Sequence, residues 1–265
     1  MRILKKREDG YHELTSLFQA VSLHDIMHFT IASRDSLTCT DPTLQCGLDN
    51  FVTKAVELFR SKTLIKQHFC IDIEKNIPQQ AGLGGGSSNC ATTLFALNQL
   101  CNTNIPEETL RSWAATISAD APFFFSSGTA YCQGIGEKVE SLAPFPWLTS
   151  KNIYIFMPNE GLSTRDIFHN LDLSQCKQIS PNTLLTRFRG GEPLFHNDLE
   201  QIATKLCPTL IEFKKILLQQ GFEALFMTGS GTACVALSNS LNITIDNSLN
   251  AYLSLPINRN NSDWY

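Results

Sequence analysis

The sequence predicts a protein of mixed helices and strands (α+β) that forms two domains. Segments with strand-like alternation and segments with helical spacing follow one another through the first half of the chain. A length of 265 residues allows one large domain but favours two. A stretch rich in proline and aromatic residues, 144–147, precedes a new strand-like segment. We therefore predict a first domain over residues 1–147 and a second over residues 148–265.

The first predicted domain alternates strands with helices. Apolar and polar residues alternate in the strand candidates, and apolar residues recur every three or four positions in the helix candidates. Asn50 can cap a helix, and the segment 104–108 combines a cap, a proline and two acids, which is a helix start signal. In chain order the candidates are strands 17–23 and 26–32, a helix after Asn50, a strand 69–74, a helix capped by Ser87 or Ser88, and a helix after Pro106.

The second predicted domain begins with an alternating strand around Ile155. Two helices, 198–206 and 208–220, are expected to follow, and 224–227 is predicted as a last strand. Residues 247–265 are largely polar, so we expect a loosely held tail.

Composition excludes several classes of protein. The formal net charge of −4 gives no general attraction to nucleic acid or to anionic membranes. The nine cysteines are odd in number and include no C-x-x-C pair, which favours reduced thiols over a disulfide set or a zinc site. The histidines form no metal-binding pattern, so any metal ligands are unknown from the sequence. Because there is no apolar run of membrane-spanning length and no apolar segment typical of a signal peptide, we expect a cytoplasmic protein without nucleic-acid or membrane partners.

The most informative segment is a glycine-rich run between the strand 69–74 and a predicted helix. It comprises Pro78, Gln79, Gln80, Ala81, Gly82, Leu83, Gly84, Gly85, Gly86, Ser87 and Ser88. A glycine-rich turn at a helix start presents unpaired N–H groups and the positive end of the helix dipole, which together bind anions, most often phosphate. Glycines lose more conformational entropy on folding than other residues, and a plain connection would not need so many of them. A glycine-rich surface turn without a ligand is the alternative interpretation.

Three common phosphate-binding templates do not fit this run. The dinucleotide fingerprint starting at Gly82 requires glycine at position 87, which is Ser87. A P-loop requires a lysine after its last glycine, but Gly86 is followed by Ser87 and Ser88. The later motifs of protein kinases are absent from the sequence. What remains is a loop that holds phosphate with backbone amides and two hydroxyl groups.

Three further segments can contribute to a reaction or to recognition. Asp120 lies in a short turn between apolar segments, where its carboxylate could act as a general base or simply cap the turn. Residues 228–232 form a second glycine- and serine-rich turn, able to close over a ligand, although such turns are also common in hairpins. Tyr11 and His12 place an aromatic ring beside a ring that both donates and accepts, which suits a nucleobase; half-buried packing is the alternative for Tyr11.

Taken together, these segments resemble the motifs of the GHMP kinase superfamily, which includes galactokinase and the homoserine, mevalonate and phosphomevalonate kinases. The glycine run 78–88 and the turns 118–124 and 227–233 correspond to its three motifs. A finer pattern is similar to one branch of the superfamily, whose members act on a diphosphocytidyl-linked methylerythritol. The segments that carry it are 9–14, 84–86 and 119–124, and the similarity extends from about residue 4 to about residue 237.

The resemblance implies the activity and the roles of the site residues. It implies phosphoryl transfer from ATP, with Mg²⁺, to the C2 hydroxyl of that substrate in non-mevalonate isoprenoid biosynthesis. The run 78–88 would hold the ATP phosphates, and Asp120 would be the catalytic carboxylate. Tyr11 and His12 would hold the cytosine, with Phe168 as the opposite stacking face. The turn that would close the site contains Gly229, Ser230 and Gly231.

The resemblance also implies a fold. An N-terminal α/β domain with a left-handed βαβ crossover, of the ribosomal protein S5 domain 2-like type, would be followed by a ferredoxin-like C-terminal domain. Together they make up the two-domain GHMP kinase fold.

The sequence departs from the family pattern at its beginning. The family opens with a strand of the type Pro-Ala-Lys-Ile-Asn-Leu, whose lysine neutralises charge at the transferring phosphate. Residues 1–4 resemble the end of that strand, and Lys5 and Lys6 lie beyond it, so we assign them no such role. Either the missing segment lies upstream of Met1, which is our expectation, or the protein has lost this lysine. Two other functions stay open, a non-catalytic nucleotide-binding relic and a sister kinase for another small alcohol.

Overall fold

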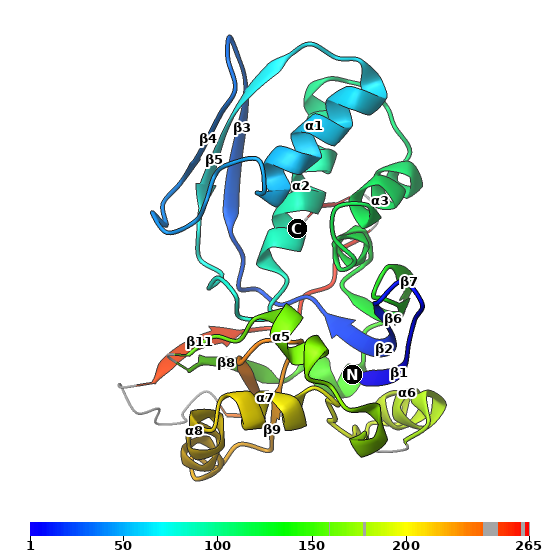
Figure 1. Cartoon of the computed structure of the whole chain (residues 1–265), viewed down its shortest axis with the longest axis vertical. Helices are drawn as coiled ribbons and strands as arrows, with labels where there is room; N and C mark the ends of the chain where they lie inside the picture. The colour runs from blue at the N-terminus through cyan, green and yellow to red at the C-terminus, as the bar shows by residue number, and fades with distance from the viewer. Residues whose placement is uncertain (159, 177–178, 241–248, 261–262, 265) are drawn as a thin grey trace. The chain divides into compact units, whose positions relative to one another are not determined.

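The computed structural model of the chain describes residues 1–158, 160–176, 179–240, 249–260 and 263–264 (Figure 1). Contacts between residues divide the chain into two compact units. The first unit comprises Met1–Leu23, Gln80–Leu83 and Ser127–Tyr265, and the second comprises His24–Gln79 and Gly84–Ser126. The chain therefore passes from one unit to the other within the glycine-rich run. These two units are defined by contacts between residues, whereas the predicted domains are consecutive parts of the chain that meet between residues 147 and 148. The predicted domain boundary stays a prediction.

The second unit combines a sheet with helices. Its elements are β3 (Ile26–Ala32), β4 (Ser36–Cys39), α1 (Phe51–Thr63), β5 (His68–Glu74), α2 (Gly85–Leu100), α3 (Glu107–Ala115) and the short 3-10 helix η1 (Ala121–Phe125). The strand order is β3–β5–β4, in which β5 is antiparallel to β3 and parallel to β4. Because α1 connects the two parallel strands, β4, α1 and β5 form a βαβ crossover.

Local sequence signals explain α1 and β5. The side chain of Asn50 accepts a hydrogen bond from the N–H group of Val52 at 2.9 Å, so the predicted cap is confirmed. In β5, Phe69 and Ile73 are each 1% exposed, as the alternation predicts, because one face of the strand packs in the core. The predicted apolar stripe of α1 is buried as well, and it consists of Val52, Ala55, Val56 and Phe59.

Helix α2 starts earlier than the sequence predicts. Its first residue is Gly85 and its N-cap is Gly84, which has a φ of +71° and is therefore in the left-handed region that favours glycine. The prediction that Ser87 or Ser88 caps the helix is wrong, because both serines lie inside its first turns. The start of α2 consequently has no side-chain cap.

The first unit contains two four-stranded antiparallel sheets, ordered β1–β2–β6–β7 and β11–β8–β10–β9. The elements of the first sheet are β1 (Arg2–Lys6), β2 (His12–Gln19), β6 (Thr129–Gly134) and β7 (Lys138–Ser141). The remaining elements are α4 (Pro146–Thr149), β8 (Asn152–Met157), α5 (Thr164–His169), η2 (Leu173–Gln175), α6 (Pro181–Arg189), α7 (Glu200–Leu206), α8 (Thr209–Leu218), β9 (Ala224–Met227), β10 (Cys234–Ser238) and β11 (Asn250–Ser254).

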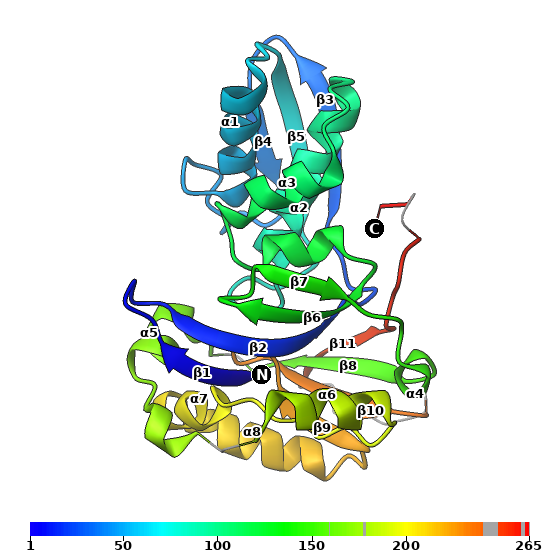
Figure 2. The ribbon, with the colours of Figure 1, turned by 90° about the vertical axis from the view of Figure 1, so that its right-hand side faces the viewer.

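Strand β8 is buried on both of its faces. Tyr154 and Phe156 belong to a core shared with α5, α7 and α8, and Figure 2 shows α7 and α8 on one side of this sheet. Ile153 and Ile155 point to the opposite face, into a second core that includes Leu17 of β2. Strands β8 and β9, which helices connect, flank β10, and this is the split βαβ arrangement of the expected ferredoxin-like fold.

Several predicted elements need correction. The strand expected at 17–23 lies at His12–Gln19. Residues 1–4, which resemble the end of a strand, belong in part to β1. The elements that were not predicted are β4, β6, β7, β10, β11, α4, α5 and α6. The tail expected from residue 247 is wrong at Asn250–Ser254, because this segment pairs with β8 as an edge strand. Residues 247–248, 261–262 and 265 of that expectation lie outside the described residues. Strand 224–227 is confirmed with its bounds.

Not one of the described helices combines the length and the apolar composition that crossing a membrane requires.

Candidate active site

The glycine run ends in an uncapped helix start within the second unit. The N–H group of Ser88 is the first to donate within α2, to the carbonyl of Gly84 at 2.8 Å. The N–H groups of Gly85, Gly86 and Ser87 donate to no acceptor among the residues that the structure describes. Three unpaired donors at the positive end of a helix dipole form a ready site for an anion.

Asp120 belongs to the same unit and lies at the N-cap position of η1. Its side chain does not cap that helix, so the capping interpretation of Asp120 has no support. Within the described part of the chain the carboxylate forms neither a hydrogen bond nor an ion pair. Desolvation by burial raises its pKa from 3.8 to about 6. A carboxylate with a pKa near neutrality and an open acceptor is suited to remove a proton.

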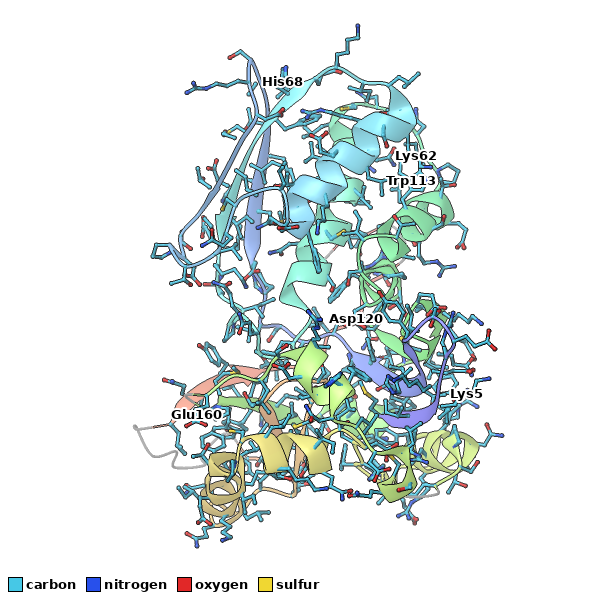
Figure 3. All side chains as sticks on the ribbon, in the orientation of Figure 1. Lys5, Lys62, His68, Trp113, Asp120 and Glu160 are labelled. Atoms are coloured by element: carbon cyan, nitrogen blue, oxygen red, sulfur yellow. The ribbon has the colours of Figure 1, made fainter. Side chains whose placement is uncertain are left out.

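A pair of serines joins the turn before Asp120 to the start of α2. The hydroxyl groups of Ser87 and Ser118 are 2.8 Å apart, which is hydrogen-bonding distance. A Cβ placed on Gly84 would lie 3.3 Å from the ring of Phe124 in η1, so the two segments are also packed together there. Figure 3 marks Asp120 near this end of α2. The second unit therefore brings the predicted carboxylate and the predicted anion site together.

The middle of the glycine run meets the second glycine turn inside the first unit. A Cβ placed on Gly82 would lie 2.6 Å from the backbone nitrogen of Gly231, and one placed on Gly229 would lie 2.5 Å from the carbonyl oxygen of Gly82. Real Cβ atoms do not approach so closely, so the two backbones cross where only glycine fits. Ser230, between these glycines, is 2.7 Å from the hydroxyl group of Thr164. That the turn closes over a ligand stays a prediction.

The residues predicted to bind cytosine lie in the first unit. Tyr11 is 61% exposed, whereas His12 is buried in β2. The rings of His12 and Phe168 stack at 5.3 Å between centroids with an angle of 29°. Burial, and secondarily the charge of Lys6, lower the pKa of His12, which keeps its ring neutral. Phe168 thus packs on His12, and whether it also faces a base on Tyr11 stays a prediction.

Lys5 and Lys6, to which we assign no catalytic role, lie on the exposed part of β1. The ammonium group of Lys5 is 3.2 Å from the carboxylate of Glu13 on β2, and its side chain is 69% exposed. Such an exposed pair contributes little to stability.

Sequence reasoning missed four polar residues that hold the two glycine segments. Asn197 donates to the carbonyl groups of Met227 and Gly229 at 3.1 and 2.8 Å, and so anchors the second turn. Asp25, Lys75 and Asn89 form a network beside the glycine run. The partners are far apart in the sequence, 50 residues for Asp25 and Lys75 and 64 for Asp25 and Asn89, so no local pattern could reveal them.

The described residues include no group of three His, Cys, Asp or Glu side chains that could hold a metal ion. Magnesium in phosphoryl-transfer enzymes is commonly held by one or two protein oxygens together with substrate phosphates, which needs no such cluster. Ser87, Ser118 and Asp120 provide oxygen donors of this kind.

Comparison with known proteins adds the family. A family model described as "GHMP kinases N terminal domain" matches residues 50–128. The 4-diphosphocytidyl-2-C-methyl-D-erythritol kinase of Protochlamydia amoebophila is 43% identical over 265 residues, which cover 100% of this chain and 88% of the relative. The chloroplastic enzyme of that name from Arabidopsis thaliana is 38% identical over 90% of this chain, and the chain spans 64% of that longer relative.

Solved structures agree with the sequence comparison. A crystal structure of 4-(cytidine 5'-diphospho)-2C-methyl-D-erythritol kinase aligns with a TM-score of 0.77 and 29% identity, covering 96% of this chain and 94% of the other. A mevalonate kinase aligns with a TM-score of 0.64 at 13% identity, which shows the shared fold alone. The two-domain GHMP kinase fold expected from the motifs is thereby confirmed. The chain belongs to the 4-diphosphocytidyl-2-C-methyl-D-erythritol kinase family of the GHMP kinases.

Proposed function

We propose that this protein transfers the γ-phosphoryl group of ATP to the C2 hydroxyl of 4-diphosphocytidyl-2-C-methyl-D-erythritol, giving the 2-phosphate. The names of the relatives supply the substrate. The structural observation that carries the proposal is Asp120, a desolvated carboxylate without a partner in the described chain, beside an uncapped helix start. These are the two parts that phosphoryl transfer to an alcohol requires, a proton acceptor and an anion cradle.

The phosphates of ATP would bind at the start of α2. The free N–H groups of Gly85, Gly86 and Ser87 would donate to phosphate oxygens, and the helix dipole would add a favourable field. Because donors of this kind are fixed before the reaction, they stabilise the charge of the transition state without reorganisation. The remaining residues of the predicted cradle, 78–83, would complete the loop around the nucleotide.

Asp120 would act on the alcohol. Its carboxylate accepts the proton of the C2 hydroxyl while the hydroxyl oxygen forms a bond to the γ-phosphorus. The bond between that phosphorus and the β,γ-bridging oxygen breaks, and ADP leaves with the electron pair. A pKa of about 6 keeps Asp120 largely ionised at neutral pH yet basic enough to assist.

Magnesium would be held mainly by ATP, with the hydroxyl group of Ser87 as the protein ligand that the structure offers at the helix start. When bound, it supplies neutralisation of the phosphate charge. Asp120 would then remain available for the proton.

Recognition of the cytosine is assigned to Tyr11, His12 and Phe168. Tyr11 presents an exposed ring on which a base could stack. The neutral ring of His12 has one donor and one acceptor, which matches the mixed hydrogen-bonding edge of cytosine. Its contact with Phe168 would hold that ring in one orientation.

The proposal places the protein in the cytoplasm, at a step of non-mevalonate isoprenoid biosynthesis, with ATP and a small-molecule substrate as its ligands. No nucleic-acid or membrane partner is included.

The test is an ADP-release assay with purified protein, ATP and Mg²⁺. We expect turnover with the diphosphocytidyl substrate and none above background with homoserine or phosphomevalonate. Turnover with one of the controls instead would support a sister kinase. Binding of ATP without turnover of any alcohol would identify a non-catalytic relic.

A further inference from the structure

A buried ion pair lies at the base of the glycine run. Asp25 immediately precedes β3, and Lys75 immediately follows β5. Their side chains are only 1% and 6% exposed, and the ammonium group is 2.9 Å from the nearer carboxylate oxygen. Asp25, Lys75 and the residues that they bind, which are Asn76, Ile77 and Asn89, all belong to the second unit, so their geometry is that of one compact body.

Asp25 fixes the chain just before the run. Its Oδ1 atom accepts hydrogen bonds from the backbone N–H groups of Asn76 and Ile77, each at 2.8 Å. The ammonium group of Lys75 donates in addition to the carbonyl oxygen of Ile77. Both polar backbone groups of Ile77, the residue that precedes Pro78, are therefore bound to the ion pair.

The same carboxylate fixes the chain just after the run. Its Oδ2 atom accepts a hydrogen bond from Asn89 Nδ2 at 2.9 Å, and Asn89 follows Ser88 on α2. The ammonium group of Lys75 also lies near the helix start, since a Cβ placed on Gly85 would be 3.4 Å from it. Residues 78–88 are thus closed at both ends by one carboxylate.

We propose that Asp25, with Lys75 and Asn89, is a positioning residue that holds the glycine run in its nucleotide-binding shape. This inference rests on the proposed function. A run with several glycines has many conformations, and ordering it on binding would reduce affinity unless the fold has already restricted it. Fixing both of its ends leaves fewer conformations and orients the free N–H groups of α2.

Stability alone does not explain the pair. The attraction between the two charges of a buried ion pair offsets little more than the free-energy cost of removing both charges from water. An apolar pair of similar volume often stabilises a fold equally well. An apolar pair, however, could not accept from two backbone N–H groups and from Asn89 at once. The arrangement is therefore suited to specifying the geometry of the run.

Two asparagines of α2 provide a matched test. Asn89 and Asn98 are both buried, at 5% and 8% exposure, and each ties α2 to another segment. Asn98 binds Ile105 and Thr103 at the other end of the helix and makes more hydrogen bonds than Asn89. Asn89→Ala leaves the ion pair in place, so this variant should fold.

We expect Asn89→Ala to raise the Kd of MgATP about tenfold, which corresponds to about 1.4 kcal/mol. Asn98→Ala should lower the melting temperature at least as much and leave the Kd within about twofold of wild type. Calorimetry measures the affinities, and amide hydrogen exchange of residues 79–87 reports the loop directly, with faster exchange expected only in Asn89→Ala. A Kd for Asn89→Ala within about twofold of wild type, or an equal loss in both variants, would overturn the proposal.

Aspartates provide a second pair of variants. Asp35 also accepts from a backbone N–H group, that of Phe69, and pairs with Arg60 and His68. It contacts the opposite end of β5, and Figure 3 shows His68 far from Asp120. Asp25→Asn should reduce kcat/KM for ATP by about 10- to 100-fold, since small misplacements of reacting groups have effects of this size, and Asp35→Asn should lower stability without that loss.

The outcomes separate this inference from the proposed function. If wild type binds MgATP but phosphorylates no alcohol, the proposed function fails, and the affinities of the four variants still decide the role of Asp25. If wild type does not bind MgATP, the exchange rates of residues 79–87 decide it. If wild type is an active kinase and the Asn89 and Asn98 variants behave alike, only the role of Asp25 fails.

Discussion

The two units of this protein carry functional groups of opposite kinds. In the second unit the candidate groups are ionisable: Asp120 is half-buried and has a pKa raised by desolvation, and Asp25 and Lys75 form a buried pair. In the first unit they are an exposed ring, Tyr11, and a crossing of glycine backbones at Gly82. The roles that we predict for these residues thus divide between the units, with charge chemistry assigned to the second and recognition and shape to the first.

The glycines of the two units also differ in what an added side chain would meet. A Cβ added to Gly85 or Gly86 would meet side chains of Ile77 and Phe51 at 3.1 and 3.3 Å, and side chains can shift by a few tenths of an ångström. At the Gly82–Gly231 crossing the added atom would meet backbone at 2.6 Å, and a backbone shifts at a greater cost than the end of a side chain. Glycine is therefore a steric requirement at this crossing, whereas at Gly85 and Gly86 an added Cβ would meet only side chains.

The largest effect should come from the carboxylate of the second unit. We expect Asp120→Asn to lower kcat by roughly 10²-fold or more while ATP still binds, because the proton acceptor is lost and the fold is kept. Steady-state kinetics and calorimetry measure the two quantities. Asp172→Asn is the matched control, since Asp172 caps the 3-10 helix η2 with its side chain and Asp120 does not cap η1. Near-normal turnover of Asp120→Asn would remove it from the mechanism.

The backbone crossing of the first unit should respond to one methyl group. In Gly231→Ala the new Cβ would clash with the carbonyl group of Ala81 and would lie 2.6 Å from the backbone nitrogen of Gly82, so the turn must shift. We expect a loss of about 1–3 kcal/mol in the free energy of unfolding, which is typical of overpacking. Gly161→Ala, whose new atom would meet Gln80 at 3.9 Å, should be nearly neutral. Equal denaturation midpoints for the two variants would contradict the steric argument.

Recognition should depend on the exposed ring. Tyr11→Ala removes a stacking face worth about 1–3 kcal/mol in other base–aromatic contacts, so the KM for the diphosphocytidyl substrate should rise and that for ATP should not. Tyr11→Phe keeps the ring and should keep the KM. If both substrates weaken equally in Tyr11→Ala, the residue supports the fold and the cytosine assignment is wrong.

The smallest predicted effect links the Asp120 carboxylate to stability. Its pKa is about 6 in the folded protein against 3.8 as the ordinary value, so the folded state takes up the proton more readily. This contribution to stability is present below pH 3.8 and is lost as the pH rises through about 6. Asp120→Asn should therefore be more stable than wild type at pH 8, by an amount on the order of 1 kcal/mol, with the difference vanishing near pH 4. Melting curves at both pH values test this, and a variant less stable at pH 8 would contradict it.

Local signals in the sequence determined the elements whose causes lie within a few residues. Asn50 and the apolar stripe behind it specify α1, alternation specifies β5, and the glycine run specifies a turn before a helix. The motif combination also identified the family, because it depends on residue types at fixed spacings rather than on contacts.

Only the tertiary structure decided how these pieces work together. Asp25 meets Asn89 across 64 residues, and Gly82 meets Gly231 from a distant part of the chain. Such contacts depend on the path of the whole chain, so a pattern within a few neighbouring residues cannot predict them. The start of α2 at Gly85 rather than at the serines is also seen only in the structure, where Gly84 is the N-cap in a left-handed conformation that favours glycine.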